Sequence, residues 1–168
     1  MRMIDPLIME FDRECATTRK MLERVPEARF DWTPHVKSMN LGKLATHVAT
    51  LPAWIGSSLL QDGYDFGDGK GGVPATPATT AEIVAMFDKA VAEAKKAMSQ
   101  LDDEKAMGGW TLSGLGKAMF SMPRLALVRS VLINHSIHHR GQLSVYLRLL
   151  DVPVPAIYGP SADENPFA

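Results

Sequence analysis

The sequence predicts an all-α domain, a four-helix bundle in which one connection is a long crossover. Four separate segments repeat apolar residues at the three- and four-residue spacing of an amphipathic helix. A Gly/Pro-rich segment, 61–78, separates the second helical segment from the third. The chain shows no internal repeat, no low-complexity segment and no sign of a second unit. We therefore expect one domain over residues 1–168, built from packed helices.

The first two predicted helices each begin with a capping signal. Asp5-Pro6 predicts the start of a helix over about 5–24, with Asp5 as the capping carboxylate and proline at a position where its missing N–H is harmless. Asn40 is a favourable N-cap for a second helix over about 40–60. Pro52 lies inside this second helix and is expected to bend it, because proline removes a backbone hydrogen bond.

The second half of the chain holds the other two helices. Thr79 and Glu82 have the spacing of a capping box, which predicts a third helix from there to about residue 101. The preceding crossover is long for a tight helix hairpin and can leave the second and third helices parallel. The glycines between 108 and 116 suggest a small hairpin before a fourth helix over about 123–150. The proline-rich tail after it is expected to run extended over the bundle.

Composition excludes several classes of partner. The formal net charge is −1, so electrostatics give no case for nucleic acid or an anionic membrane surface. No apolar run approaches the roughly 20 residues of a bilayer-spanning helix, and the N-terminus turns polar too early for a signal peptide. The single cysteine, Cys15, excludes an intrachain disulfide and fits a cytoplasmic location. Cys15 lies on an apolar stripe, which favours a core residue over a reactive thiol.

Three histidines lie on apolar helix faces. His135 and His139 have the i, i+4 spacing that points two rings at one place, and His47 lies on the inner face of the second helix. A structural alternative is that all three are core histidines satisfied by hydrogen bonds. His138 is an alternative partner for His135 at i, i+3, but it lies at the edge of the stripe. Three neutral nitrogen ligands from facing helices favour a divalent metal with one open position, as in catalytic zinc sites.

Other residues of the fourth helix have candidate roles. Gln142 and Tyr146, one and two turns beyond His139, are candidates to orient a ligand, with core packing as the alternative. Arg140 points away from the inner face and is expected to pair with a carboxylate or a carbonyl. A second stripe on the far side of this helix predicts a symmetric homodimer, because too much of the helix is apolar for one buried face; it comprises Ala126, Ser130, Ile133, Ile137 and Ser144.

The two histidine segments resemble those of the DinB/YfiT-like family. Residues 44–52 resemble its first histidine segment, and residues 134–143 contain the H-x-x-x-H-R-G-Q signature of the second. Residues 31–35 and the tail 155–164 are similar to the family's first connector and to a tail of one branch. The resemblance implies an up-down-down-up bundle, a homodimer, and zinc or nickel on the three histidines. Some relatives are thiol-dependent transferases or isomerases, which implies a low-molecular-weight thiol as a possible substrate.

The chemistry expected of such a site depends on where the nucleophile comes from. Cys15 is placed in the core and no serine stands beside a histidine in a recognisable triad, so the nucleophile is expected to be water or a thiol from solution. The resemblance favours thiol transfer or isomerisation over metal-dependent hydrolysis. Two non-enzymatic alternatives remain, a metal that only stabilises the bundle and an interaction protein with vestigial histidines.

Overall fold

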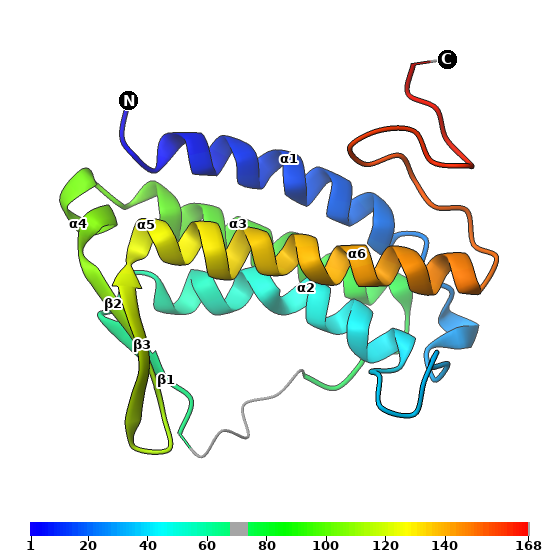
Figure 1. The fold of residues 1–168 in the computed structure, drawn as a ribbon, viewed down its shortest axis with the longest axis horizontal. Helices are drawn as coiled ribbons and strands as arrows, with labels where there is room; N and C mark the ends of the chain where they lie inside the picture. Colours follow the sequence, from blue (N-terminus) through cyan, green and yellow to red (C-terminus); the bar gives the residue numbers. More distant parts are fainter. Residues whose placement is uncertain (68–73, 168) are drawn as a thin grey trace.

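Four long helices pack side by side, and a small sheet lies at one end of them (Figure 1). The computed structural model describes residues 1–67 and 74–167. The fourth helix is continuous and includes a π-helical segment. Two short helical turns, Glu27–Arg29 and α4 (Asp103–Met107), lie outside the four long helices. The long helices are α1 (Asp5–Leu22), α2 (Leu41–Ser58), α3 (Thr80–Ser99), and α5 (Arg124–Leu127) followed by the π segment (Val128–Ile133) and α6 (Asn134–Leu149).

The helix starts follow local side-chain chemistry, with one correction. Asn40 accepts a hydrogen bond from the Lys43 backbone N–H, and the Thr79–Glu82 capping box is complete, as predicted. Asp5 is not the N-cap, because α1 begins at Asp5 itself. Its carboxylate instead accepts bonds from the Arg2 backbone and guanidinium, which lower the Asp5 pKa.

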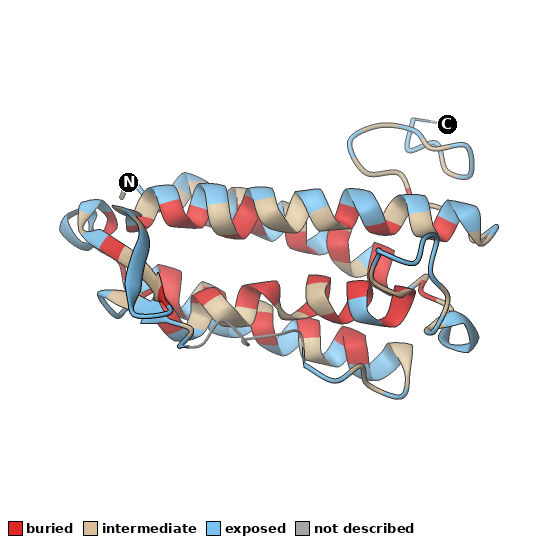
Figure 2. Ribbon diagram, turned by 60° about the horizontal axis from the view of Figure 1, so that its bottom comes forward, coloured by how far each residue is buried: buried red, intermediate tan, exposed pale blue. Residues whose placement is uncertain are grey.

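The core lies where the inner faces of the four helices meet. α1 and α2 each contact both α3 and α6, and Figure 2 shows the buried residues on the sides that face one another. Burying a large aliphatic side chain there contributes about 1.5–3 kcal/mol. Ile133 is 1% exposed within this core, so the predicted outer stripe of the fourth helix is wrong at that residue.

A three-stranded sheet corrects the all-α prediction. β2 (Gly109–Gly114) and β3 (Lys117–Pro123) form the predicted hairpin, and β1 (Gly63–Asp65) adds a parallel strand that was not predicted. Leu115 and Gly116 turn the chain with positive φ angles of 53° and 73°, which suits the twist of a two-residue hairpin. The buried Trp110 indole donates to the Ser58 carbonyl at 3.1 Å, which fastens the sheet to the end of α2.

The C-terminal tail is not helical, as predicted, but it folds back on itself near the C-terminal ends of α1 and α6 and does not run extended over the bundle (Figure 1). Two carboxylates fix it. Asp163 pairs with Arg148 and accepts from the Val154 N–H, while Glu164 pairs with Arg24. Part of the predicted crossover, residues 68–73, lies outside the described residues. Within the ranges that are described, none of the helices has both the length and the apolar character needed to cross a membrane.

Candidate metal centre

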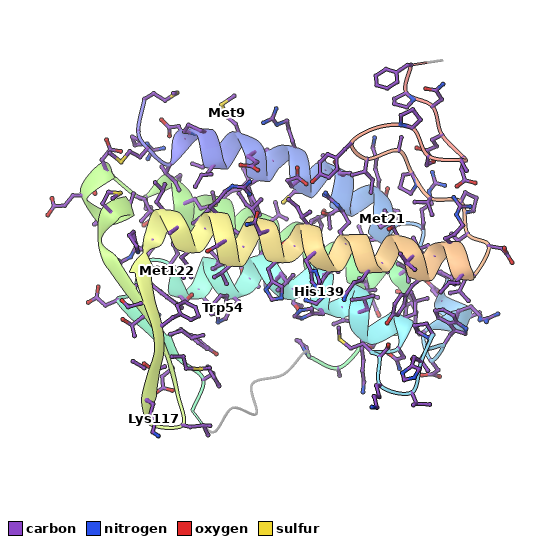
Figure 3. All side chains as sticks on the ribbon, viewed as in Figure 1. Met9, Met21, Trp54, Lys117, Met122 and His139 are labelled. Atoms are coloured by element: carbon purple, nitrogen blue, oxygen red, sulfur yellow. The ribbon has the colours of Figure 1, made fainter. Side chains whose placement is uncertain are left out.

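Three histidines from two facing helices converge on one point. α2 carries His47 and α6 carries His135 and His139, and one ring nitrogen of each lies within 4.8 Å of the others. The ring centroid of His47 is 4.4 Å from that of His139 and 5.4 Å from that of His135. Figure 3 shows His139 between α6 and α2. All three histidines are partly exposed.

The nitrogen spacing fits a divalent ion. The two Nε2 atoms of His135 and His139 are 2.8 Å apart, and the full set spans up to 4.8 Å. Three nitrogens bound to one tetrahedral zinc ion are about 3.4 Å apart, which lies inside this range. The donors are also of one chemical type, since neutral imidazole nitrogens suit zinc, nickel and copper. The residues present therefore fit the metal that the sequence led us to expect.

Burial and mutual repulsion keep these histidines neutral near pH 7. Burial, with the nearby His139 and His135, lowers the pKa of His47 to about 4. The pKa values of His135 and His139 are lowered as well, chiefly by burial and then by neighbouring histidines. A metal can bind only the unprotonated nitrogen, so all three rings are in the state that ligation requires.

Groups of the same helix approach two of the rings. The Nδ1 atom of His139 lies 2.7 Å from the Oε1 atom of Gln142, and the Val131 backbone lies close enough to His135 to oppose part of the lowering of its pKa. Val131 belongs to the π segment, which ends with the Asn134 N–H bonded to the Arg129 carbonyl five residues back. Single π-helical turns are frequent at functional sites. Sequence reasoning missed this segment, because it contains neither glycine nor proline.

The other candidate residues take different places. Tyr146 donates to the Met39 carbonyl at 3.1 Å and meets Trp32 edge-to-face, which supports the packing alternative for this residue. His138 is exposed beside His139 and is outside the three-nitrogen cluster. His35 is an exposed loop residue, as expected.

Arg140 has the structural role predicted for it, but it is buried and does not lie on an outer surface. Its guanidinium pairs with the Glu14 carboxylate at 2.6 Å and donates to the Glu14 carbonyl and the Thr18 hydroxyl. It also donates to the hydroxyl of Tyr158 from the tail. The side chain is 2% exposed, because α1 and the tail cover the face of α6 that turns away from the histidines.

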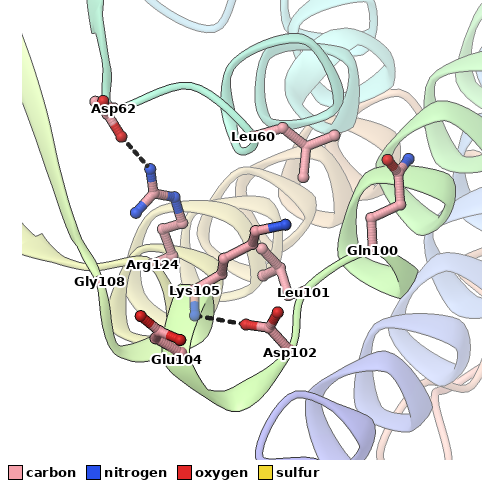
Figure 4. A pocket seen from close by; sticks show the side chains of 9 residues that line it. All are labelled: Leu60, Asp62, Gln100, Leu101, Asp102, Glu104, Lys105, Gly108 and Arg124. Atoms are coloured by element: carbon pink, nitrogen blue, oxygen red, sulfur yellow. Dashed lines mark hydrogen bonds and ion pairs between the residues drawn. The ribbon is translucent and has the colours of Figure 1, made fainter.

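A cavity of about 560 Å³ lies away from the histidines and is not the better candidate site (Figure 4). Arg124 is its most buried charged residue, and its guanidinium donates to the carbonyls of Leu59, Gly109 and Gln61 and pairs with Asp62. These bonds join the fourth helix to the sheet, so the arginine is committed to structure. The convergent nitrogens of the histidine cluster outweigh cavity size as a sign of chemistry.

Comparison with known proteins identifies the family and similar folds. The sequence matches the DinB family over residues 3–166. A DinB-like protein of Bacillus cereus ATCC 10987 has a similar structure, with a TM-score of 0.69 and 22% identity over 90% of this chain and 95% of that one. A DinB-like protein of Bacillus subtilis gives a TM-score of 0.66 and 16% identity over 89% and 96%. A search of curated proteins gave no match. The chain therefore belongs to the DinB family.

Proposed function

We propose that this DinB-family chain is a metal-dependent enzyme that uses a low-molecular-weight thiol. The observation that carries the proposal is the convergence of His47, His135 and His139 within 4.8 Å. These three residues would hold one divalent ion, zinc or nickel. When bound there, the ion would act as a Lewis acid that lowers the pKa of a ligand from solution. Three neutral histidines leave the ion its full charge, which favours an anionic fourth ligand.

The nucleophile in this proposal comes from solution, because the chain's only thiol is poorly placed. Cys15 is 9% exposed on α1, and burial raises its pKa to about 12. A thiol with that pKa is almost wholly protonated near pH 7 and is a weak nucleophile. In the proposed transfer, a small thiol loses its proton to water, its sulfur bonds to an electrophilic carbon, and the bond from that carbon to the leaving group breaks, so that the leaving group departs with the electron pair.

The thiol is preferred over water on chemical softness and on the family resemblance. Thiolate sulfur is a soft anion that suits zinc and nickel. Hydroxide satisfies the same electrostatics, so a metal-dependent hydrolase is the second candidate. A non-catalytic metal-binding or interaction module is the third, in which the ion only stabilises the helices.

One experiment separates these candidates. Cobalt-substituted protein is titrated with a panel of cellular thiols, and its absorption is recorded beside turnover assays with electrophiles and with an activated ester. Thiol use predicts a sulfur-to-cobalt charge-transfer band and transfer to the electrophile. Ester hydrolysis that rises near pH 7, without a band, would establish the hydrolase instead. Loss of folding on chelation without any turnover would favour the non-catalytic role.

The proposal extends to architecture, assembly and location. We infer an up-down-down-up bundle, a cytoplasmic protein and a symmetric homodimer through the outer side of α6. Ala126 and Ser130, two residues of the predicted outer stripe of the fourth helix, are exposed, which supports an interface there. Light scattering at micromolar concentration should give twice the chain mass; a monomer would count against the dimer.

A further inference from the structure

The side-chain amide of Gln142 faces His139, one of the three clustered histidines. Its Oε1 atom lies 2.7 Å from Nδ1 of His139, one helical turn away on α6. Gln142 is an exposed residue, and this is its one side-chain hydrogen bond among the residues that the structure describes. The contact therefore serves the His139 ring and adds little to the packing of the core.

This contact favours one tautomer of His139. A carbonyl oxygen only accepts hydrogen bonds, so the contact is a hydrogen bond when Nδ1 of His139 carries the proton. A neutral imidazole has a single N–H, which leaves a lone pair on Nε2. That atom faces Nε2 of His135 at 2.8 Å, at the point where the three histidines meet.

We propose that Gln142 is a positioning residue that selects the metal-binding tautomer of His139. The inference rests on the proposed metal function, and it replaces a role for Gln142 in touching the substrate. Without the amide oxygen, the His139 proton is free to reside on Nε2, where it blocks ligation. Outer-shell partners of this kind typically change metal affinity by about 10–100-fold.

The amide of Gln142 is neutral, so its effect on His139 differs from that of a carboxylate at the same position. A carboxylate in the same place would draw the Nδ1 proton more strongly and make Nε2 a better electron donor. The neutral glutamine holds the ring without adding negative charge, so a bound ion keeps more of its own charge. Gln142→Glu should therefore bind zinc at least as tightly as the wild-type protein, while Gln142→Met should bind it less tightly.

The test combines ring-nitrogen NMR on metal-free protein with zinc titration. At pH 7.5, ¹⁵N shifts should place the His139 proton on Nδ1 in the wild-type protein and in Gln142→Glu. In Gln142→Met, which keeps side-chain length but removes the acceptor, part of the population should move the proton to Nε2. Zinc affinity should fall about 10–100-fold in that variant. Ser144→Ala, on the same helix with its hydroxyl bonded to the Gly141 carbonyl, is the matched control and should change neither reading.

Two results would overturn the positioning role. One is a His139 proton that stays on Nδ1 in Gln142→Met, and the other is an Nε2 proton already present in the wild-type protein. The NMR reading needs no metal, so it decides the role of Gln142 even if the wild-type protein fails to bind zinc. Failure to bind zinc would instead count against the proposed function.

Discussion

His139 and Arg140 are neighbours in sequence, yet their polar groups have opposite surroundings. The Arg140 guanidinium is buried and has three partner residues from two elements of its own chain: Glu14 and Thr18 on α1 and Tyr158 on the tail. The Nε2 atom of His139 faces another histidine nitrogen at 2.8 Å, with a third histidine ring close by. Both faces of α6 therefore carry polar groups. On the arginine face, hydrogen bonds and an ion pair with other residues of the chain satisfy the polar group.

This difference separates a structural network from a ligand site. A buried charge is tolerated when a counter-charge and hydrogen bonds satisfy it, as they do for Arg140. Three convergent nitrogen atoms of one chemical type are instead a ligand set that a divalent cation from solution would complete.

Removing the arginine should have the largest effect on folding. Arg140→Ala leaves the Glu14 carboxylate without its guanidinium in a mostly buried site, and losing one partner of such a pair costs about 3–5 kcal/mol. Denaturant unfolding of metal-free protein measures this loss. Arg148→Ala is the control, because its ion pair with Asp163 is on the surface. If the two variants lost equal free energy of unfolding, the buried Arg140 network would contribute no more to stability than a surface ion pair.

Zinc should stabilise the protein through the histidine face alone. At a free concentration about 1,000 times Kd, a ligand that binds only the folded state adds about 4 kcal/mol. We expect this gain in the wild-type protein and in Arg140→Ala, and we expect it to vanish in His135→Ala. Thermal or denaturant unfolding with and without zinc measures the gain. A gain lost in Arg140→Ala, measured where that variant is folded, would show that the two faces are coupled.

Acid should weaken the metal-free fold through His47. Its pKa is about 4 in the folded chain against an ordinary 6.5, so between these values the unfolded chain binds more protons. The stability that depends on neutral His47 is thus present above pH 6.5 and is lost as pH falls toward 4. The free energy of unfolding should fall more steeply with acid in the wild-type protein than in His47→Ala. Parallel curves would contradict the burial of this ring.

The smallest effect should come from the tail. Tyr158 is 71% exposed, but its hydroxyl donates to Glu14 and accepts from Arg140, each at 2.7 Å. Tyr158→Phe removes only this hydroxyl and should cost about 1 kcal/mol of unfolding free energy, without a change in zinc affinity. If the variant matched the wild-type protein in stability, the tail would not contribute to the arginine network.

Local signals explain which features were predictable from the sequence. Asn40 and the Thr79–Glu82 pair mark helix starts because capping depends on residues a few positions apart. The histidine cluster was visible because His135 and His139 have i, i+4 spacing on an apolar face. β1 was missed because three residues pair with a strand more than 40 positions away, and no local pattern encodes that pairing. The partners of Arg140 were hidden for the same reason, since Glu14 and Tyr158 lie far from it in the chain.

Metal analysis of untagged protein would show whether the three histidines bind an ion. We expect one divalent ion per wild-type chain, held by His47, His135 and His139. His47→Ala should lose high-affinity binding, while His35→Ala, which changes an exposed loop histidine, should bind as the wild-type protein does. Elemental analysis after equilibrium dialysis gives the stoichiometry of all three proteins. Full metal occupancy in His47→Ala would contradict the assignment of the site.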